Sequence, residues 1–393
     1  MTPTRREFLR TAGVMGAGLA LGGAASCAPD AGGAADADTS RDPDSASSSP
    51  SAVPKRLLVL GGTGFIGPHM VRYAVERGHE VTIFTRGRSA ADIPDVEHLV
   101  GDRNDDHSAL RGRTWDVVLD NNAQDYRWVR RSTELLADAA EQYVLVSSIS
   151  AYALEGFGWE NAGRILTEPA VAEDAPLIRP PAGWTDGQEA PYGLMKSLSE
   201  EIVRRAFTGR ATVVRPGLIV GPGDPTDRFT YWPVRLDEGG EVLAPGNPEH
   251  ATQVIDQRDL TEWIVRLAES GTAGDFNATG PAGRMSMATM LDRVGSATSG
   301  TYELTWVPEP FLEQEGLRPW SDLPAWIPGD PLMFVDVRRA VGAGLTFRAL
   351  TDTARDTLAW DRARPAEERE NRAAGMSRER EREVLARWSA TLR

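Results

Sequence analysis

A short apolar run that leads straight into a glycine-rich segment constrains the fold of this chain more than any other feature. The run is Arg56–Leu60, and Gly61-Gly62-Thr63-Gly64-Phe65-Ile66-Gly67 follows it without a break. Apolar side chains at helical spacing then occupy residues 66–78. A strand, a glycine turn and a helix in this order are typical of the first unit of a dinucleotide-binding α/β sheet.

The three glycines at the ends and middle of this segment have different expected tasks. Gly61 allows the tight turn, Gly64 lets the backbone approach a pyrophosphate, and Gly67 lets the helix pack closely on the strand. The phosphates would lie at the positive end of the helix. The alternative is a plain tight turn without a ligand. The candidate cofactor-binding residues of the loop are Gly61, Thr63, Gly64, Phe65, Ile66 and Gly67.

Strand-like and helix-like segments alternate after this unit. The expected strands are residues 80–85, 97–100, 116–119, 143–147 and 211–215, and the expected helices are 127–141 and 192–207. Such alternation implies right-handed βαβ units and a parallel sheet. The chain is therefore predicted to be an α/β protein with a Rossmann-type, doubly wound parallel sheet and a smaller C-terminal α/β substrate-binding domain.

Changes in composition divide the chain further. Beyond Gly221 proline, glycine and tryptophan become frequent, and the last stretch is rich in arginine, glutamate and alanine. The predicted divisions are a signal peptide (1–27), a disordered linker (28–54), a sheet domain (55–220), a substrate-binding or lid region interleaved with it (221–349), and a solvent-exposed helical segment (350–393).

The N-terminus has the pattern of an export signal. Arg5-Arg6 precedes a weakly hydrophobic run, residues 12–25, which is too short and too rich in glycine to span a bilayer as a stable helix. Cys27 follows small residues, as in lipoprotein signals, although Ala24 replaces the usual leucine. These features predict export by the twin-arginine machinery to the periplasm or cell envelope, with a lipid anchor at Cys27. The alternative is a disordered basic terminus.

Overall charge and residue counts exclude other classes of protein. The 393 residues have a net charge of −14, which argues against a nucleic-acid partner. The single cysteine rules out an intramolecular disulfide. The five histidines show no metal-ligand spacing, so no metal site is expected.

The end of the second expected strand bears on the choice of cofactor. An NAD-binding protein would place an acidic residue there for the adenosine ribose, but no acid lies between Val81 and Ala91. Arg86 and Arg88 occupy this stretch and would suit the 2′-phosphate of NADP. NADP is therefore favoured over NAD. The alternative is that both arginines are solvated loop charges.

The two lysines of the chain are Lys55 and Lys196, and every other residue among the 43 basic ones is arginine. Lys196 lies four positions after Tyr192, so the two side chains would share one helix face. An ammonium group near a phenol favours the phenolate, and the pair can then serve as a general acid/base for an alcohol and a carbonyl. A surface pair on an exposed helix is the alternative.

Several motifs in one order resemble the extended short-chain dehydrogenase/reductase family, in its NAD(P)-dependent epimerase/dehydratase group. They are the glycine loop, Gly101-Asp102, Tyr192-x-x-x-Lys196, Arg215-Pro216-Gly217 and Gly221-Pro222, within residues 55–280. The resemblance implies catalytic roles for Ser148, Tyr192 and Lys196. It also implies that Asp102 contacts the adenine, that Ala123 lies beside the nicotinamide, and that Lys196 holds the cofactor ribose.

Two departures from the family pattern stand out. The fourth-strand motif reads Asp120-Asn121-Asn122-Ala123, which would put polar groups near the nicotinamide. Ser148 and Tyr192 are also unusually far apart in the chain, and the extra loop, with Trp159 and Trp184, is expected to cover the site.

The leading hypothesis is an exported enzyme that acts on a sugar or sugar-like secondary alcohol. Because no supply of free NAD(P)H is expected outside the cytoplasmic membrane, such an enzyme should hold its cofactor tightly and regenerate it within each cycle. An NADPH-dependent carbonyl reductase and a non-catalytic binding protein on the same fold are the alternatives. The tryptophans between residues 159 and 326 would suit either stacking on sugar rings or core packing. A homodimer is one assembly open to such a chain.

Overall fold

The computed structural model describes residues 53–393, apart from residues 89–92, 94 and 155–157. The predicted signal peptide, with Cys27, and almost all of the predicted linker lie outside the described residues. In the part of the chain that is described, no helix is long and apolar enough to cross a membrane.

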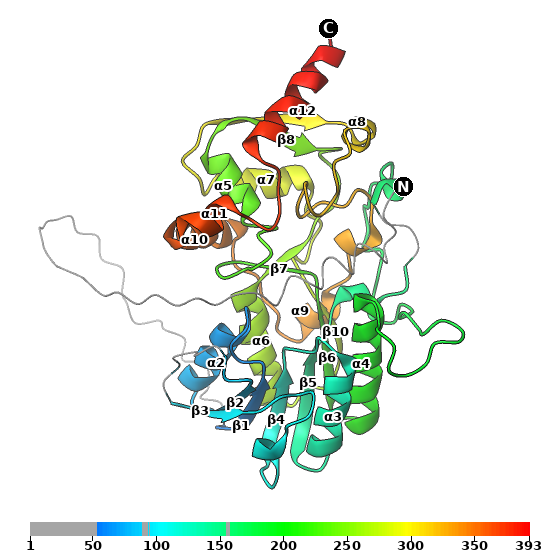
Figure 1. The fold of residues 1–393 in the computed structure, drawn as a ribbon, viewed down its shortest axis with the longest axis vertical. Helices are drawn as coiled ribbons and strands as arrows, with labels where there is room; N and C mark the ends of the chain where they lie inside the picture. The colour runs from blue at the N-terminus through cyan, green and yellow to red at the C-terminus, as the bar shows by residue number, and fades with distance from the viewer. Residues whose placement is uncertain (1–52, 89–92, 94, 155–157) are drawn as a thin grey trace, which may run out of the picture.

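A seven-stranded parallel sheet forms one half of the molecule (Figure 1). Its strand order is β10-β6-β5-β4-β1-β2-β3. The strands are β1 (Arg56–Leu60), β2 (Glu80–Thr85), β3 (Val96–Val100), β4 (Trp115–Asp120), β5 (Ala140–Val146), β6 (Ala211–Pro216) and β10 (Gly274–Ala278). The predicted Rossmann-type parallel sheet is confirmed, and its winding reverses between β1 and β4, where such folds bind ligands.

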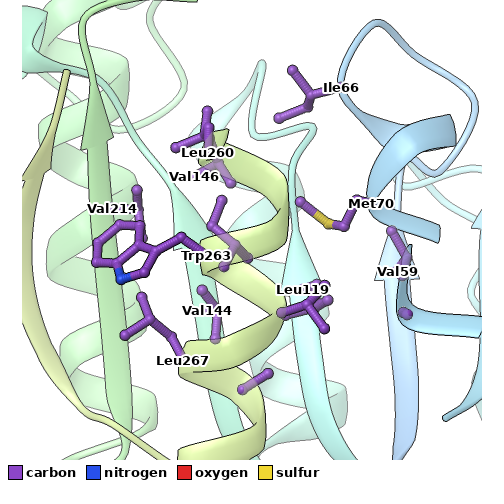
Figure 2. Packing of buried hydrophobic residues seen from close by; sticks show 14 of the residues in the cluster. Val59, Ile66, Met70, Leu119, Val144, Val146, Val214, Leu260, Trp263 and Leu267 are labelled. Carbon is purple, nitrogen blue, oxygen red and sulfur yellow. The ribbon is translucent and has the colours of Figure 1, made fainter. Parts of the chain in front are cut away.

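Helices cover both faces of this sheet. On one face α2 (Gly67–Glu76) packs against α6 (Gln257–Ser270), and on the other α3 (Tyr126–Leu136) packs against α4 (Tyr192–Ala206). Figure 2 shows Trp263 and Leu260 of α6 among apolar side chains of the sheet strands. The chain thus returns to the sheet with α6 and β10 after it has entered the second half of the molecule.

The predicted helix over residues 127–141 is wrong at its C-terminal end. The helix ends at Leu136, and Ala140 already pairs with Trp115 of β4 as the first residue of β5. Alanine and glutamate at positions 139–141 favour helix locally, but the pairing with β4 overrides that preference.

The second half of the molecule has two small parallel ribbons and its own core. β7 (Leu218–Val220) pairs with β9 (Val254–Asp256), and β8 (Gly240–Pro245) pairs with β11 (Tyr302–Val307). Its helices are α5 (Tyr231–Asp237), α7 (Met287–Gly295) and α8 (Glu309–Gln314). The short helix α9 (Arg338–Gly342) packs instead against β10 of the large sheet. The buried side chains of Trp232 and Trp326 lie in the core of this half. In the described chain as a whole, short 3₁₀ turns lie at Ser108–Leu110, Ile149–Ala151, Gly158–Asn161 and Pro331–Met333.

The C-terminal segment, residues 350–393, consists largely of helices and is only partly exposed to solvent. It contains α10 (Leu350–Ala363), α11 (Ala366–Glu370) and α12 (Arg378–Thr391). Glu381 of α12 is 1% exposed and forms an ion pair of 2.7 Å with Arg235. The many charged residues of α12 suggested a fully exposed helix, but the buried Glu381 pairs with Arg235 and so attaches α12 to the second core.

Candidate active site

The glycine loop connects β1 to α2 as expected for a phosphate-binding turn. Gly61 has a φ of +91°, a left-handed conformation that favours glycine. A Cβ atom on Gly67 would lie 2.5 Å from the backbone carbon of Gly62, so only glycine lets the helix start this close to the turn. A Cβ atom on Gly64 would meet nothing within 4 Å. Gly61 and Gly67 are therefore required by the backbone conformation and packing of the loop itself, whereas Gly64 leaves open space in front of it.

This room belongs to a cavity of about 460 Å³ at the ends of the central strands. Most of the residues predicted for the site line it together: Gly61, Thr63, Gly64, Phe65, Ile66, Gly67, Arg86, Asp102, Ser148, Tyr192 and Lys196. Arg88, Arg103, Asn121, Asn122, Gln124, Trp128 and Ser147 also contribute to its wall. One cavity thus contains both the loop motif and the tyrosine–lysine motif.

Ala123 is the predicted residue that the structure places elsewhere. It is completely buried in the core between the sheet and α3, with Leu60 and Val129. Its neighbours Asn121 and Asn122 line the cavity instead. The polar residues of the fourth-strand motif therefore form the wall that the resemblance assigned to Ala123.

Tyr192 and Lys196 lie on the first two turns of α4. The Nζ atom of Lys196 is 5.7 Å from the centroid of the Tyr192 ring. It donates one hydrogen bond, of 3.1 Å, to the carbonyl oxygen of Val146, and the residue is only 4% exposed. An ammonium group has three donors, so the others are left to face the cavity.

Ser148 lies at the end of β5 across from this helix. Its hydroxyl oxygen accepts a hydrogen bond of 3.1 Å from the backbone N–H of Ser150, and so caps the following turn. This contact fixes the position of the side chain, which lines the cavity. The hydroxyl hydrogen stays available to a ligand.

A buried polar network beneath the cavity was not predicted. Glu200, one turn after Lys196, accepts a hydrogen bond of 2.5 Å from the Ser147 hydroxyl and two from Arg215, of 3.0 and 2.8 Å. Arg215 also donates to the Tyr152 hydroxyl, whose pKa burial raises to about 12. The sequence did contain one sign of Glu200's position, since Tyr192, Lys196 and Glu200 are spaced by four and so share one helix face.

A second buried network surrounds Arg103, the residue directly after Asp102. Arg103 forms a bidentate ion pair with Asp120, with N–O distances of 2.8 and 2.7 Å, and the Tyr143 hydroxyl donates to the same carboxylate. Burial raises the pKa of Tyr143 well above its usual value. No spacing in the sequence links these three residues, because they come together only when the strands pair.

The surroundings of Arg86, Arg88 and Asp102 are more open. Both arginines are exposed on the cavity rim, and neither forms an ion pair with any residue that the structure describes. Asp102 accepts hydrogen bonds from the backbone and side-chain nitrogens of Asn104.

The long segment between Ser148 and Tyr192 does not cover the cavity in the way predicted. Among its described residues, none lines the cavity wall. Trp184 packs against Tyr126 of α3, with ring centroids 6.0 Å apart, and Trp159 packs against Trp326, at 5.7 Å. Part of the expected lid, residues 155–157, lies outside the described residues. The described tryptophans of this segment serve packing.

The described residues contain no group of three or more His, Cys, Asp or Glu side chains that could hold a metal ion.

Fold and cavity together define a Rossmann-type protein in which a glycine loop and a tyrosine–lysine pair line one cavity. The family model described as "NAD dependent epimerase/dehydratase family" matches residues 57–279, and the chain belongs to this family.

Two relatives illustrate the range of the family. The chain is 35% identical over 247 residues to the chloroplast stem-loop binding protein of 41 kDa b from Arabidopsis thaliana, covering 58% of this chain and 59% of that one. It is 28% identical over 254 residues to dTDP-4-dehydro-6-deoxy-D-allose reductase from Streptomyces bikiniensis, covering 58% and 76%. The match thus spans less than two thirds of the Arabidopsis protein.

Solved structures show the same fold. The Bordetella bronchiseptica enzyme WbmH, in complex with NAD⁺, superimposes with a TM-score of 0.56 at 18% identity, over 79% of this chain and 99% of that one. The human epimerase family protein SDR39U1, with NADPH, gives a TM-score of 0.51 at 20% identity, over 77% and 99%.

Proposed function

We propose that this protein is a nicotinamide-nucleotide-dependent oxidoreductase that interconverts a secondary alcohol and a carbonyl on a sugar-like substrate. The observation that carries the proposal is the buried ammonium of Lys196, 5.7 Å from the Tyr192 ring, on the wall of the cavity that the glycine loop also lines. A surface pair on an exposed helix would not place a buried cation in a cavity.

The residues present fit a nicotinamide dinucleotide. The open space in front of Gly64 leaves room for a pyrophosphate, and it lies beside the N-terminus of α2, the positive end of that helix. The free donors of Lys196 suit ribose hydroxyls. When bound, the nicotinamide supplies the acceptor or donor of a hydride.

The protein's own groups handle the proton and the substrate oxygen. In the oxidation direction the Tyr192 tyrosinate takes the proton of the substrate alcohol and becomes the neutral hydroxyl. In the reduction direction the hydroxyl donates its proton to the carbonyl oxygen and the tyrosinate is left, and the positive charge of Lys196 stabilises this negative oxygen. The hydroxyl of Ser148 donates a hydrogen bond to the same substrate oxygen and orients it.

NADP is the cofactor we favour. Arg86 and Arg88 lie on the cavity rim without an ion-pair partner in the described chain, and no acidic residue lies between Val81 and Ala91. Guanidinium groups in this position would bind a 2′-phosphate. The solved relatives include one complex with NAD⁺ and one with NADPH, so both nucleotides occur on this fold.

The substrate class rests on the relatives. One of them is named as a reductase of a dTDP-sugar, so a sugar-like substrate is the natural proposal for this chain. An NADPH-dependent carbonyl reductase, without return of the hydride, is the alternative that uses the same residues.

A second candidate is a non-catalytic binding protein. The Arabidopsis relative is named as a stem-loop binding protein, which raises RNA as a ligand. The net charge of −14 opposes it, since phosphate backbones need a basic surface. Retention of Ser148, Tyr192 and Lys196 around one cavity favours catalysis.

We further propose export by the twin-arginine route, with Cys27 lipidated at the cell envelope. The support is the Arg5-Arg6 motif and the single cysteine directly after the hydrophobic run. Since this route carries folded proteins, the nucleotide would be loaded before export. A redox-neutral reaction that returns the hydride to the substrate would then need no outside supply.

The catalytic proposal is tested with Tyr192→Phe. The purified wild type is assayed on a panel of sugar and sugar-nucleotide alcohols, and the variant should lose about 10²–10⁴-fold in turnover, the usual weight of a general acid/base. Its nucleotide affinity should stay at the wild-type value, because the ring remains. A Tyr192→Phe protein with full turnover would contradict the mechanism, and a wild type that binds nucleotide without any turnover would favour the binding protein.

The location proposal is tested by fractionation. Replacing Arg5-Arg6 by Lys-Lys should keep the precursor in the cytoplasm, and Cys27→Ser should release the exported protein from the membrane fraction. A Cys27→Ser protein that still sediments with membranes would contradict the anchor.

A further inference from the structure

One arginine beside the proposed active site has no polar partner. Arg228 lies in the segment between β7 and α5 (Figure 1), and none of its nitrogens donates a hydrogen bond to a described residue. Its Nε atom is completely buried without a hydrogen-bond partner. The other described arginines that lack hydrogen-bond partners are exposed, apart from Arg369 of α11. A half-buried cation of this kind needs an explanation, because buried polar groups are nearly always paired.

The position of Arg228 connects it to the reacting groups. Pro225, three residues earlier, lines the same cavity as Tyr192, and Gly223 lies against Phe65 of the glycine loop. Burial lowers the pKa of Arg228, and attraction to Asp224 and to Tyr192 opposes that shift. The guanidinium is therefore within electrostatic range of the proposed catalytic hydroxyl.

Asp224 does not neutralise this arginine directly. No ion pair joins the two side chains, and one carboxylate oxygen of Asp224 is already taken by the backbone N–H and hydroxyl of Thr226, each at 2.8 Å. Its other oxygen is buried without a partner. Two oppositely charged side chains thus lie near each other without the contact that would satisfy both.

The backbone around Arg228 is strained so as to hold it there. Asp227, directly before it, has a φ of +53°, and Trp320, whose ring lies 5.2 Å from the guanidinium carbon, has a φ of +69°. Non-glycine residues rarely adopt such angles, and they persist where the surroundings enforce them. The Asp227 carboxylate is clamped by Arg364, at 2.6 Å, and by the backbone N–H of Ala373.

We propose that Arg228 anchors an oxyanion subsite next to Tyr192, and that the substrate of the proposed reaction carries a carboxylate or phosphate group which this guanidinium binds. The inference rests on the proposed function. Stacking on Trp320 orients the planar guanidinium and leaves its N–H edge free, and that edge matches the two oxygens of a carboxylate or phosphate. A lysine could not supply the same two parallel hydrogen bonds.

The test is a set of calorimetric titrations with three probes: D-glucuronate, D-glucose 6-phosphate and neutral D-glucose. The wild type should bind at least one acidic probe about ten-fold more tightly than D-glucose or better, as expected for a charge-assisted hydrogen bond. The acidic probe that binds more tightly distinguishes carboxylate from phosphate. Arg228→Gln should abolish the preference, and Arg228→Lys should retain only part of it.

Arg369→Gln is the matched control, since Arg369 is also half-buried with an unpartnered Nε atom and should not affect the preference. Each titration is run with and without NADP. Unchanged NADP affinity in Arg228→Gln shows that the variant is folded. Equal binding of all three probes by the wild type, or a preference that survives Arg228→Gln, overturns the subsite. If the wild type binds no NADP but prefers the acidic probes, the proposed function fails and the subsite stands.

Discussion

The two halves of the molecule build their sides of the cavity by different means. The sheet half presents a glycine loop, a helix N-terminus and short polar side chains, so its shape on this side of the cavity is set mainly by the backbone. The second half contributes little wall beyond Ile219 and Pro225. Close to Pro225 in the chain, the guanidinium of Arg228 has no hydrogen-bond partner among the described residues and stacks on Trp320, which is far away in sequence. Backbone recognition suits a ligand shared by many proteins. Individual side chains from distant segments suit a ligand that is particular to one.

The largest stability effects should come from one buried ion pair in each half, Glu200–Arg215 below the cavity and Glu381–Arg235 in the second core. Glu200→Ala leaves Arg215 without its main partner, and Glu381→Ala does the same to Arg235. Each should cost about 3–5 kcal/mol in the free energy of unfolding, because one charge stays buried. Urea unfolding followed by circular dichroism measures both.

This matched pair also tests whether the halves unfold together. Since α6 and β10 return to the sheet from the second half, one shared transition is expected in both variants. A variant with two separated unfolding transitions would show that the two halves unfold independently and would contradict this expectation.

A smaller effect should appear at the carboxylate beside Arg228. Burial raises the pKa of Asp224 from 3.8 to about 6. The folded protein therefore holds this proton more tightly than the unfolded chain, and stability falls as pH rises from about 4 to about 6. Asp224→Asn removes that cost, so the variant should match the wild type near pH 4 and exceed it by on the order of 3 kcal/mol at pH 8.

The measurement is the difference in unfolding free energy between variant and wild type across this pH range. A difference that does not change with pH would mean that Asp224 titrates normally, and the second half would then lack the buried charge ascribed to it.

The smallest effect on stability is expected at Gly64. Gly64→Ala meets no atom of the protein, so its unfolding free energy should stay within about 1 kcal/mol of the wild type. Its NADP affinity should nevertheless fall about ten-fold or more, because the methyl group enters the space for the phosphates. Gly67→Ala is the contrasting variant, since its Cβ atom meets the backbone of Gly62 and should lower stability as well. Equal NADP affinity in Gly64→Ala and the wild type would remove the loop from the nucleotide site.

The same contrast explains what could be predicted from the sequence. Six of the seven sheet strands and the loop followed from local pattern, because glycines and apolar runs leave a signal within a few residues. Tyr192 and Lys196 could be paired from their spacing of four. Ala123 was assigned from the family motif alone, and the structure buries it in the core while its neighbours Asn121 and Asn122 line the cavity.

Contacts between distant segments left no such signal. Trp320 and Arg228 are far apart in the chain, and so are Arg235 and Glu381. β10 was missed because Gly274–Ala278 has too little apolar pattern to be read as a strand before it pairs with β6. The long segment before Tyr192 was expected over the site, yet its tryptophans pack against residues of α3 and of the second core.

The most direct test of the central claim is the nucleotide content of the protein itself. The protein is purified from its native host without added cofactor and denatured, and the released small molecules are identified by mass spectrometry. We expect close to one nicotinamide dinucleotide per chain, with NADP favoured, and turnover in buffer that contains none. A protein that purifies empty and binds NADP only at millimolar concentration would contradict this expectation.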